Sequence, residues 1–381
     1  MKHFDYIITG AGAAGLMLAF RMANDPYFDQ KSIALIDLTK KTGNDRTWCF
    51  WEKQHGHWDN LLSKTWKNIF FGGPGYEKRI DIFPYAYKMI RSVGFYKALW
   101  GKLDTKSNFT FIRGKIETIQ ETQEGATVKT DQDQFTASKV FNSVLLSREF
   151  EQQDKFPLLQ QHFVGWFIKT KQDHFDENMA TFMDFRVPQH DNTRFMYLLP
   201  MTSNSALVEY TLFSENLLKP EEYEQELKAY LDKHGIRDYT IEETEKGSIP
   251  MTSFDFGKNN TRNILNIGTA GGWTKASTGY TFMNTTKKTA DLIIFLKKQD
   301  DLSTFNRKTK FWLYDLVLLD VLSQYNHLGA ALFTRLFKKV KTQNILKFLD
   351  EETTILEDFQ VILSMPKGLF TRVLINRIFK F

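Results

Sequence analysis

Cysteine and long hydrophobic runs are both scarce in this chain. Cys49 is the single cysteine among 381 residues, which excludes an internal disulfide, a cysteine-rich zinc site and an iron–sulfur cluster. We therefore expect a reducing compartment and no metal centre. No uncharged apolar run reaches about 18 residues, so no membrane-spanning helix is expected. The first residues lead directly into a strand pattern, without the basic and apolar regions of a secretory signal peptide.

The excess of positive charge is also small. A formal net charge of +5 fits an anionic lipid surface or a phosphate-bearing cofactor, and it is too small to indicate a nucleic-acid partner. Aromatic residues, in contrast, are abundant, with 34 Phe, 14 Tyr and 8 Trp. Composition leaves two interpretations open: a core rich in phenylalanine, or a long apolar tunnel or membrane-facing surface.

The N-terminal segment has the pattern of a nucleotide-binding βαβ unit. Residues 4–8 predict a buried strand, 16–24 a helix and 32–36 a second strand. A glycine-rich turn at 10–15, GAGAAG, joins the first strand to the helix. A glycine motif in this strand–turn–helix context is a much more specific signal than the same motif alone.

Each glycine of the turn has a mechanical role in that interpretation. Gly10 makes the tight turn, Gly12 lets a pyrophosphate approach the backbone, and Gly15 lets the helix pack on the strand. Ala14, in the same turn, is a further expected cofactor contact. Asp37, at the end of the second strand, is placed to accept hydrogen bonds from a ribose diol. These five residues are the expected dinucleotide contacts.

A second glycine cluster favours FAD over NAD. Gly268, Gly271 and Gly272 lie late in the chain, between a predicted strand and a predicted helix. Many FAD enzymes place such a turn against the flavin pyrophosphate and ribityl chain, with an Asp after the first glycine. Thr269 occupies that position here, which puts the ribityl contact in question.

The remaining pattern predicts two interleaved sheets followed by helices. Residues 43–75 are expected to form long loops, and 109–146 a β-meander. The other expected strands are 162–169, 179–186, 194–199, 206–213 and 262–267, and the expected helices are 95–103, 221–233, 281–297 and most of the chain from 303 onward.

The predicted fold class is therefore α/β. A Rossmann-type, glutathione-reductase-like FAD-binding domain is interleaved with an antiparallel substrate domain, and a helical segment follows. We assign 1–80, 95–150 and 255–300 to the FAD-binding domain, 81–94 and 151–254 to the substrate domain, and 301–381 to a helical, membrane-facing segment.

Several short segments resemble the lycopene β-cyclases of bacteria, the flavoprotein class related to the plant chloroplast enzymes. In order along the chain they are 45–51 (DRTWCFW), 194–200 (RFMYLLP), 207–211 (LVEYT), 247–251 (GSIPM) and 276–280 (ASTGY). Each is short, but their order and spacing are specific. The resemblance covers roughly residues 4–290.

The resemblance implies that Glu209 is the essential acid of the reaction. Family members often carry a second acid at the next position, which is Tyr210 here. We therefore expect Glu209 to act without a neighbouring carboxylate.

Ring closure at the end of a linear carotene needs an acid, a base, stabilisation of a cation and exclusion of water. If Glu209 faces an apolar cavity, desolvation favours its neutral, proton-donating form; an exposed strand glutamate is the alternative. Aromatic faces attract cations, and the candidates are Trp48, Trp51, Tyr197, Trp273 and Tyr280, each of which is equally compatible with a place in the core.

The cofactors and products come from the resemblance alone. It implies FAD in its reduced form, NAD(P)H as the reductant of the flavin, and conversion of lycopene and related acyclic carotenes to β-rings, as in γ-carotene and β-carotene, without net redox change. The sequence identifies neither the base for the final deprotonation nor the number of ends cyclised, and it leaves open whether Glu209 or the flavin donates the proton.

A hydrocarbon substrate implies a membrane lipid surface as a partner. Residues 332–349 and 361–381 mix Leu, Phe and Val with Lys and Arg, as interfacial helices do. We expect a peripheral protein at the cytoplasmic face of the membrane; a helical cap with a solvated basic face is the alternative. The competing functions are an FAD-dependent monooxygenase or prenyl-chain reductase that consumes NAD(P)H, and a flavin-binding scaffold without activity.

Overall fold

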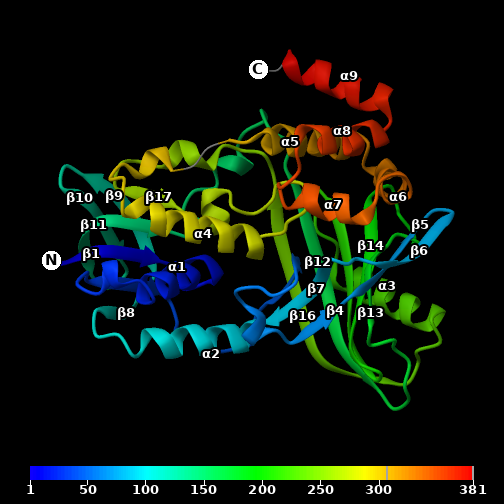
Figure 1. Cartoon of the computed structure of the whole chain (residues 1–381), viewed down its shortest axis with the longest axis horizontal. Coiled ribbons are helices and arrows are strands. Elements are labelled where there is room, and N and C mark those ends of the chain that lie inside the picture. Colours follow the sequence, from blue (N-terminus) through cyan, green and yellow to red (C-terminus); the bar gives the residue numbers. More distant parts are fainter. Residues whose placement is uncertain (306–307, 380–381) are drawn as a thin grey trace.

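The computed structural model describes residues 1–305 and 308–379. Two seven-stranded sheets lie side by side along the long axis of the molecule, with a three-stranded sheet between them and C-terminal helices at the top (Figure 1). Residues 380 and 381, which end the predicted basic tail, lie outside the described part of the chain. No helix in the described part is both long and apolar enough to cross a bilayer.

The first sheet contains the βαβ unit predicted from the glycine-rich turn. Its strand order is β8-β2-β1-β11-β10-β9, with β17 also paired to β11, and β1 lies parallel to both β2 and β11. The strands are β1 (Lys2–Thr9), β2 (Ile33–Asp37), β8 (Phe109–Arg113), β9 (Ile116–Thr122), β10 (Gly125–Thr130), β11 (Gln134–Asn142) and β17 (Ile264–Asn266).

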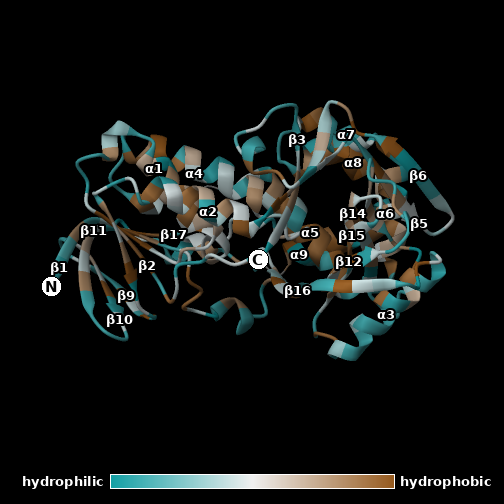
Figure 2. Cartoon of the chain, turned by 90° about the horizontal axis from the view of Figure 1, so that it is seen from below, coloured by the Kyte–Doolittle hydropathy of each residue, from teal (hydrophilic) through white to brown (hydrophobic). Residues whose placement is uncertain are grey.

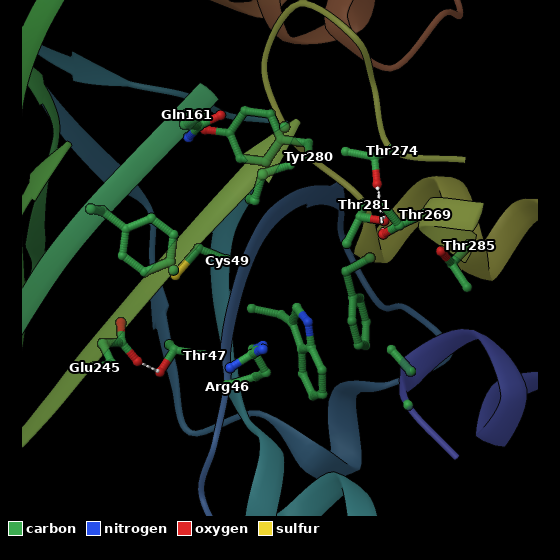
Figure 3. Close-up of a pocket in the computed structure, with 18 of the residues that line it drawn as sticks. Arg46, Thr47, Cys49, Gln161, Glu245, Thr269, Thr274, Tyr280, Thr281 and Thr285 are labelled. Carbon is green, nitrogen blue, oxygen red and sulfur yellow. Dashed lines mark hydrogen bonds between the residues drawn. The ribbon is translucent and has the colours of Figure 1, made fainter. Parts of the chain in front are cut away.

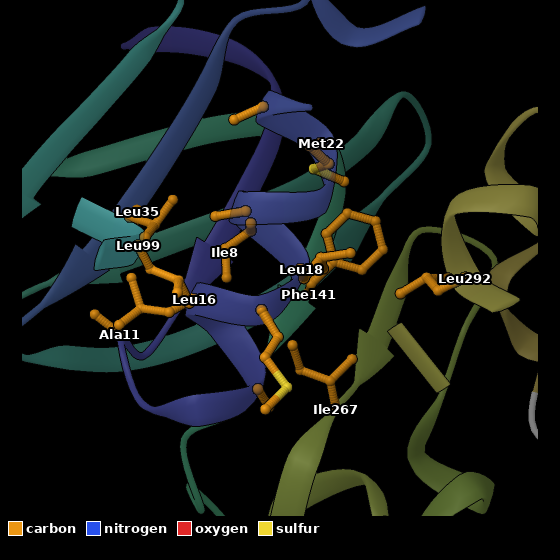
Figure 4. Packing of buried hydrophobic residues seen from close by; sticks show 14 of the residues in the cluster. Ile8, Ala11, Leu16, Leu18, Met22, Leu35, Leu99, Phe141, Ile267 and Leu292 are labelled. Carbon is orange, nitrogen blue, oxygen red and sulfur yellow. The ribbon is translucent and has the colours of Figure 1, made fainter. Parts of the chain in front are cut away.

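Helices cover one face of this sheet, and its strands carry apolar side chains on both faces. Ile8 packs with α1 (Ala13–Ala23), α2 (Ser92–Leu103) and α4 (Phe282–Leu296), whereas the adjacent Ile7 belongs to the core of the opposite face. Figure 4 shows the helix-covered side, where Leu16, Leu18 and Met22 of α1 interdigitate with Ile8, Leu35 and Phe141 of the strands. Buried aliphatic runs of this kind are typical of parallel sheets.

The second sheet is almost entirely antiparallel. Its strand order is β16-β12-β15-β14-β13-β5-β6, and only the β13–β5 pair is parallel among the described strands. The strands are β5 (Asn68–Gly73), β6 (Tyr76–Asp81), β12 (Leu159–Thr170), β13 (Met179–Asp184), β14 (Thr193–Thr202), β15 (Ser205–Ser214) and β16 (Tyr239–Met251).

The two faces of the second sheet have different covers. Helix α3 (Pro220–Lys233) packs on one face, against Val208 and Tyr210. The other face carries Leu207 and Phe213 and packs on the small sheet of β3 (Thr47–Lys53), β4 (Lys64–Trp66) and β7 (Tyr85–Arg91) and on C-terminal helices. Residue 209 belongs to this second face because side chains alternate along a strand.

Among the described residues beyond 301, five α-helices follow one another, in agreement with the helical segment that the sequence predicts for 301–381. They are α5 (Lys310–Gln324), α6 (Gly329–Lys339), α7 (Thr342–Leu349), α8 (Ile355–Ser364) and α9 (Lys367–Ile378). In Figure 1, α9 is outermost at the top of the molecule, above α5 and α8. An ion pair between Arg377 and the buried Asp320 attaches α9 to α5. In Figure 2, hydrophobic residues gather around α5 and α9, whereas α3 is mostly hydrophilic.

Two expectations for the fold are wrong. Residues 43–75 contain β3, β4 and β5 where loops were predicted, because bulky residues such as Trp66 and Phe71 are buried against partners distant in sequence. Strands β5 and β6 also pair with the second sheet, although the proposed boundary placed residues up to 80 with the nucleotide-binding domain. The division into domains otherwise remains our proposal.

Candidate active site

A cavity of about 480 Å³ is lined on one side by turns that follow strands of the first sheet and on the other by strands of the second sheet. Gly12 to Ala14 and the 268–269 turn line one end, and strands β12, β15 and β16 line the other. Figure 3 shows side chains from these separate elements converging on the space, including Gln161, Glu245, Thr269 and Tyr280. The glycine-rich turn at 10–15 and the segment 207–211, which resembles the lycopene β-cyclases, thus contribute to one site.

The first glycine turn is shaped to admit a ligand. A Cβ atom on Gly12 would meet no atom within 4 Å, so its backbone is open to the cavity. A Cβ on Gly15 would lie 2.0 Å from the Gly10 carbonyl oxygen, which explains why that position must be glycine. Asp37 Oδ2 accepts a hydrogen bond of 2.6 Å from the Ala11 amide, so its carboxylate lies against this turn.

The second glycine turn presents only its first half to the cavity. Gly268 and Thr269 line it, whereas Gly271 and Gly272 line a separate cavity of about 920 Å³ behind the turn. A Cβ on Gly271 would lie 2.1 Å from the Asn266 carbonyl oxygen, so that glycine is required by the turn itself.

Threonine hydroxyls continue the polar lining from this turn toward α4. Thr274 Oγ1 lies 3.3 Å from Thr269 Oγ1 and 3.1 Å from Thr281 Oγ1, and Thr285 also faces the cavity (Figure 3). Two further buried oxygens on the lining, Gln161 Oε1 and Thr278 Oγ1, have no hydrogen-bond partner among the residues that the structure describes. An open glycine turn, an acid beside it and unpaired polar groups are what a flavin dinucleotide requires, so these residues fit FAD.

Glu209 faces the cavity from the centre of the second sheet. In register across the strands, Tyr197 of β14, Glu209 of β15, Gly165 of β12 and Glu245 of β16 form one transverse row. Thr211 Oγ1 donates a hydrogen bond of 2.7 Å to Glu209 Oε1. The cavity therefore has two carboxyl groups in its wall, separated by a residue without a side chain.

Burial dominates the electrostatics of both carboxyls. Desolvation, and then the negative charge of Glu245, raise the pKa of Glu209 to about 8, against the opposing effect of the Thr211 hydroxyl. Desolvation also raises the pKa of Glu245, but the Thr47 hydroxyl, 2.6 Å from its Oε2, and the charge of Arg91 favour its ionised form. At neutral pH this arrangement favours a protonated Glu209 beside an ionised Glu245.

Comparisons with known proteins identify the family of this chain. The family model described as "Lycopene cyclase protein" matches residues 5–374. The chain belongs to the lycopene cyclase family.

Curated relatives of this lycopene cyclase family chain are distant in sequence. Lycopene beta-cyclase of Pantoea ananas is 24% identical over 256 residues, which cover 66% of this chain and 63% of that protein. The chloroplastic lycopene beta cyclase of Arabidopsis thaliana is 26% identical over 268 residues, or 65% of this chain and 51% of that protein. The matched part thus spans between about half and two thirds of these relatives.

Solved structures similar to this family member confirm the flavoprotein fold. A flavin-dependent brominase matches over 100% of both chains with a TM-score of 0.62 and 12% identity. A geranylgeranyl bacteriochlorophyll reductase-like protein from Thermoplasma acidophilum matches over 98% of this chain and 99% of its own, with a TM-score of 0.61 and 11% identity. At such identities the likeness establishes the fold alone.

The aromatic residues expected at the site are only partly brought together. Trp48, Tyr197 and Tyr280 line the cavity of this lycopene cyclase family member. Trp51 lies behind Tyr280, with ring centroids 4.7 Å apart, and donates its indole N–H to a carbonyl oxygen of α7. Trp273 lines the separate cavity behind the second glycine turn. Trp51 is therefore a support for Tyr280, and Trp273 lies apart from the site.

The expectation that Glu209 has no neighbouring carboxylate is wrong. Glu245 is not among the predicted site residues because the sequence pattern did not predict β16 as a strand. An available signal was its position two residues before Gly247, in an alternating segment that leads into the family's Gly-x-Ile-Pro element. Tyr210 has no bearing on the cavity, because it points toward α3 and accepts a hydrogen bond from Arg194.

Proposed function

We propose that this chain is a flavin-dependent lycopene cyclase that converts the acyclic ends of lycopene to β-rings. The observation that carries the proposal is Glu209, a carboxyl group whose pKa is raised to about 8, in the same cavity as the open glycine turn. A proton donor for an alkene must be neutral before the reaction, and the raised pKa of the partly buried Glu209 meets this condition.

Glu209 donates the proton that starts the reaction. Its carboxyl O–H transfers H⁺ to the terminal double bond of the carotene, which leaves a tertiary cation at the neighbouring carbon. The next double bond attacks that carbon and closes the ring, and loss of a second proton gives the ring alkene. The faces of Trp48, Tyr197 and Tyr280, which line the cavity, stabilise the cation by about 0.5–2 kcal/mol each.

FAD is the cofactor that the lining fits. Gly12 and Ala14 would contact its pyrophosphate, and Asp37 would contact its ribose. Gly268 and the nearby threonines would contact its ribityl chain. When bound and reduced, with NAD(P)H as the reductant, the flavin supplies negative charge that steadies a nearby cation. The protein's residues then orient the carotene end and exclude water.

Helices α8 and α9 are the proposed contact with the membrane. Large apolar side chains exposed on α8 include Leu356, Phe359 and Leu363, and on α9 Ile375 and Ile378. Lys367 and Arg372 add positive charge on α9, which favours anionic headgroups. The earlier candidate segment 332–349 contributes less, because its apolar residues Leu336, Phe337, Ile345 and Leu346 are buried. We place the protein on the cytoplasmic face.

Expression in a lycopene-accumulating bacterium tests the function. Pigment analysis is expected to show γ-carotene or β-carotene, and the ratio of the two reports whether one or both ends are closed. Unchanged lycopene from a folded, flavin-containing protein would contradict the proposal. Consumption of NAD(P)H in proportion to product would instead favour a monooxygenase or a prenyl-chain reductase of the same fold.

A further inference from the structure

We propose that Glu245 forms a proton-sharing pair with Glu209, and that this pair both supplies the first proton of ring closure and takes up the last. The inference rests on the proposed function and adds a base to it. Its basis is the transverse row in which Gly165 is in register with Glu209 on one side and with Glu245 on the other.

Gly165 creates the gap in which the two carboxyl groups meet. A Cβ atom there would lie 3.3 Å from both Glu209 Cβ and Glu245 Cγ, and 2.9 Å from Leu207 Cδ1. Each carboxyl acts on the pKa of the other. On the same face of β12, Phe163 and Phe167 flank this gap. The two partly buried carboxyls face each other across Gly165, and two negative charges in that arrangement repel each other. The pair therefore retains one proton.

The surroundings assign the charge within the pair. Thr47 donates its hydroxyl to Glu245, and the Arg91 guanidinium, itself 2.6 Å from Glu243, also acts on Glu245. Thr47 and Arg91 favour the anion at Glu245 against the opposing negative charge of Glu243, which leaves the proton on Glu209.

The thiol and the phenols that line the same cavity stay neutral. Burial raises the pKa of the Cys49 thiol and of the Tyr87, Tyr197 and Tyr280 phenols above their ordinary values. Figure 3 shows Cys49 and Glu245 on the same side of the cavity. At neutral pH these four groups therefore add no charge to the surroundings of Glu209 and Glu245.

The proton balance closes without an external reagent. Glu209 gives H⁺ to the terminal alkene, and both carboxyls are then anionic while the carbon skeleton is cationic. The cationic ring loses H⁺ to the pair, which re-forms the original one-proton state and the ring double bond. Neither oxidant nor reductant is consumed in this step, as an isomerisation requires.

The test combines infrared spectroscopy with kinetics on the flavin-loaded protein. In the resting protein without carotene, the pair is expected to show the carbonyl stretch of one protonated carboxyl group at pH 7, which disappears in Glu209→Gln. Glu245→Gln removes the repulsion, so the Glu209 signal is expected to titrate at lower pH. Glu242→Gln, on the exposed edge of β16, is the matched control and should leave both signals unchanged.

With lycopene as substrate, Glu245→Gln is expected to lower kcat by about 10²-fold or more with little change in KM, and to move the basic limb of the pH profile down. Glu245→Asp, which keeps a carboxylate, should recover part of kcat. A Glu245→Gln protein with the wild-type rate, pH profile and infrared titration would overturn the pair. If the wild-type protein does not cyclise lycopene, the proposed function fails, and the infrared titration alone decides the pair.

Discussion

Glu209 and Glu245 lie on opposite sides of Gly165 and point into the same cavity, although they are separated by 36 positions in the chain and by one intervening strand. The relationship depends on β12 being the neighbour of both β15 and β16. It gives the site two partly buried carboxyl groups on one cavity wall. The protonation state of each of these two carboxyls therefore depends on the charge of the other.

Glu209→Gln should abolish ring closure and leave flavin binding intact. The amide keeps the shape and can still accept the Thr211 hydroxyl bond, but it has no acidic proton to donate. We expect at least a 10²-fold loss of product, measured as pigment or by assay with lycopene. Full activity of a flavin-replete variant would remove Glu209 from its role.

The same variant should change how stability depends on pH. The pKa of Glu209 is raised to about 8 in the folded protein, against about 4.3 in an unfolded chain. Between these values the folded state binds more protons, so the Glu209 contribution to stability falls as the pH rises and is smallest above about pH 8.

Glu209→Gln removes that contribution, so its free energy of unfolding relative to wild type should rise by roughly 2–4 kcal/mol between about pH 5 and pH 9, because each unit of pKa corresponds to about 1.4 kcal/mol. Denaturant titrations of both proteins at several pH values measure the difference. A difference that is constant with pH would contradict the raised pKa.

Gly12→Val should lose bound flavin and keep its fold. Nothing lies within 4 Å of a Cβ at this position, so the added side chain occupies only the space where a pyrophosphate would approach. Flavin absorbance of the purified protein and its circular dichroism report the two effects separately. Gly101→Val, in an equally open position on α2, is the control and should remain yellow.

Leu356→Glu combined with Phe359→Glu should weaken membrane binding by at least about tenfold. These residues are 79% and 52% exposed on α8, and burying a large apolar side chain contributes about 1.5–3 kcal/mol. Cosedimentation with vesicles that contain an anionic phospholipid measures the loss. Leu217→Glu, 59% exposed and close to α3, is the control; an equal loss there would contradict docking through α8.

Lys275→Met should destabilise the protein by about 3–5 kcal/mol, because it leaves a buried carboxylate without its partner. Lys275 Nζ lies 3.0 Å from Asp315 and 3.1 Å from Glu351, which connects the loop before Tyr280 to the C-terminal helices. Thermal unfolding measures the change. Lys298→Met, at an exposed position, should have little effect, and an equally small change in Lys275→Met would contradict a structural role for this cluster.

Local patterns were enough to predict the nucleotide-binding half of the molecule. The turn from Gly10 to Gly15, the apolar strands beside it and Asp37 all act within one βαβ unit, whose parts are close in sequence. Helices α1, α2, α3 and α4 were likewise recognised to within a few residues, because periodicity and chain breaks mark them. Residues 43–75 were misjudged because their strands depend on partners far along the chain.

The sequence by itself determined the glycine-rich turn, the alternation that carries Glu209 to one face of its strand, and the motifs typical of the lycopene cyclase family. Only the tertiary structure decided that Glu245 stands beside Glu209, that Tyr210 turns away, and that Trp273 lies outside the cavity. The physical reason is that alternation fixes which face a side chain takes, whereas strand order and register fix its neighbours. Strand order and register are set by packing across the whole sheet.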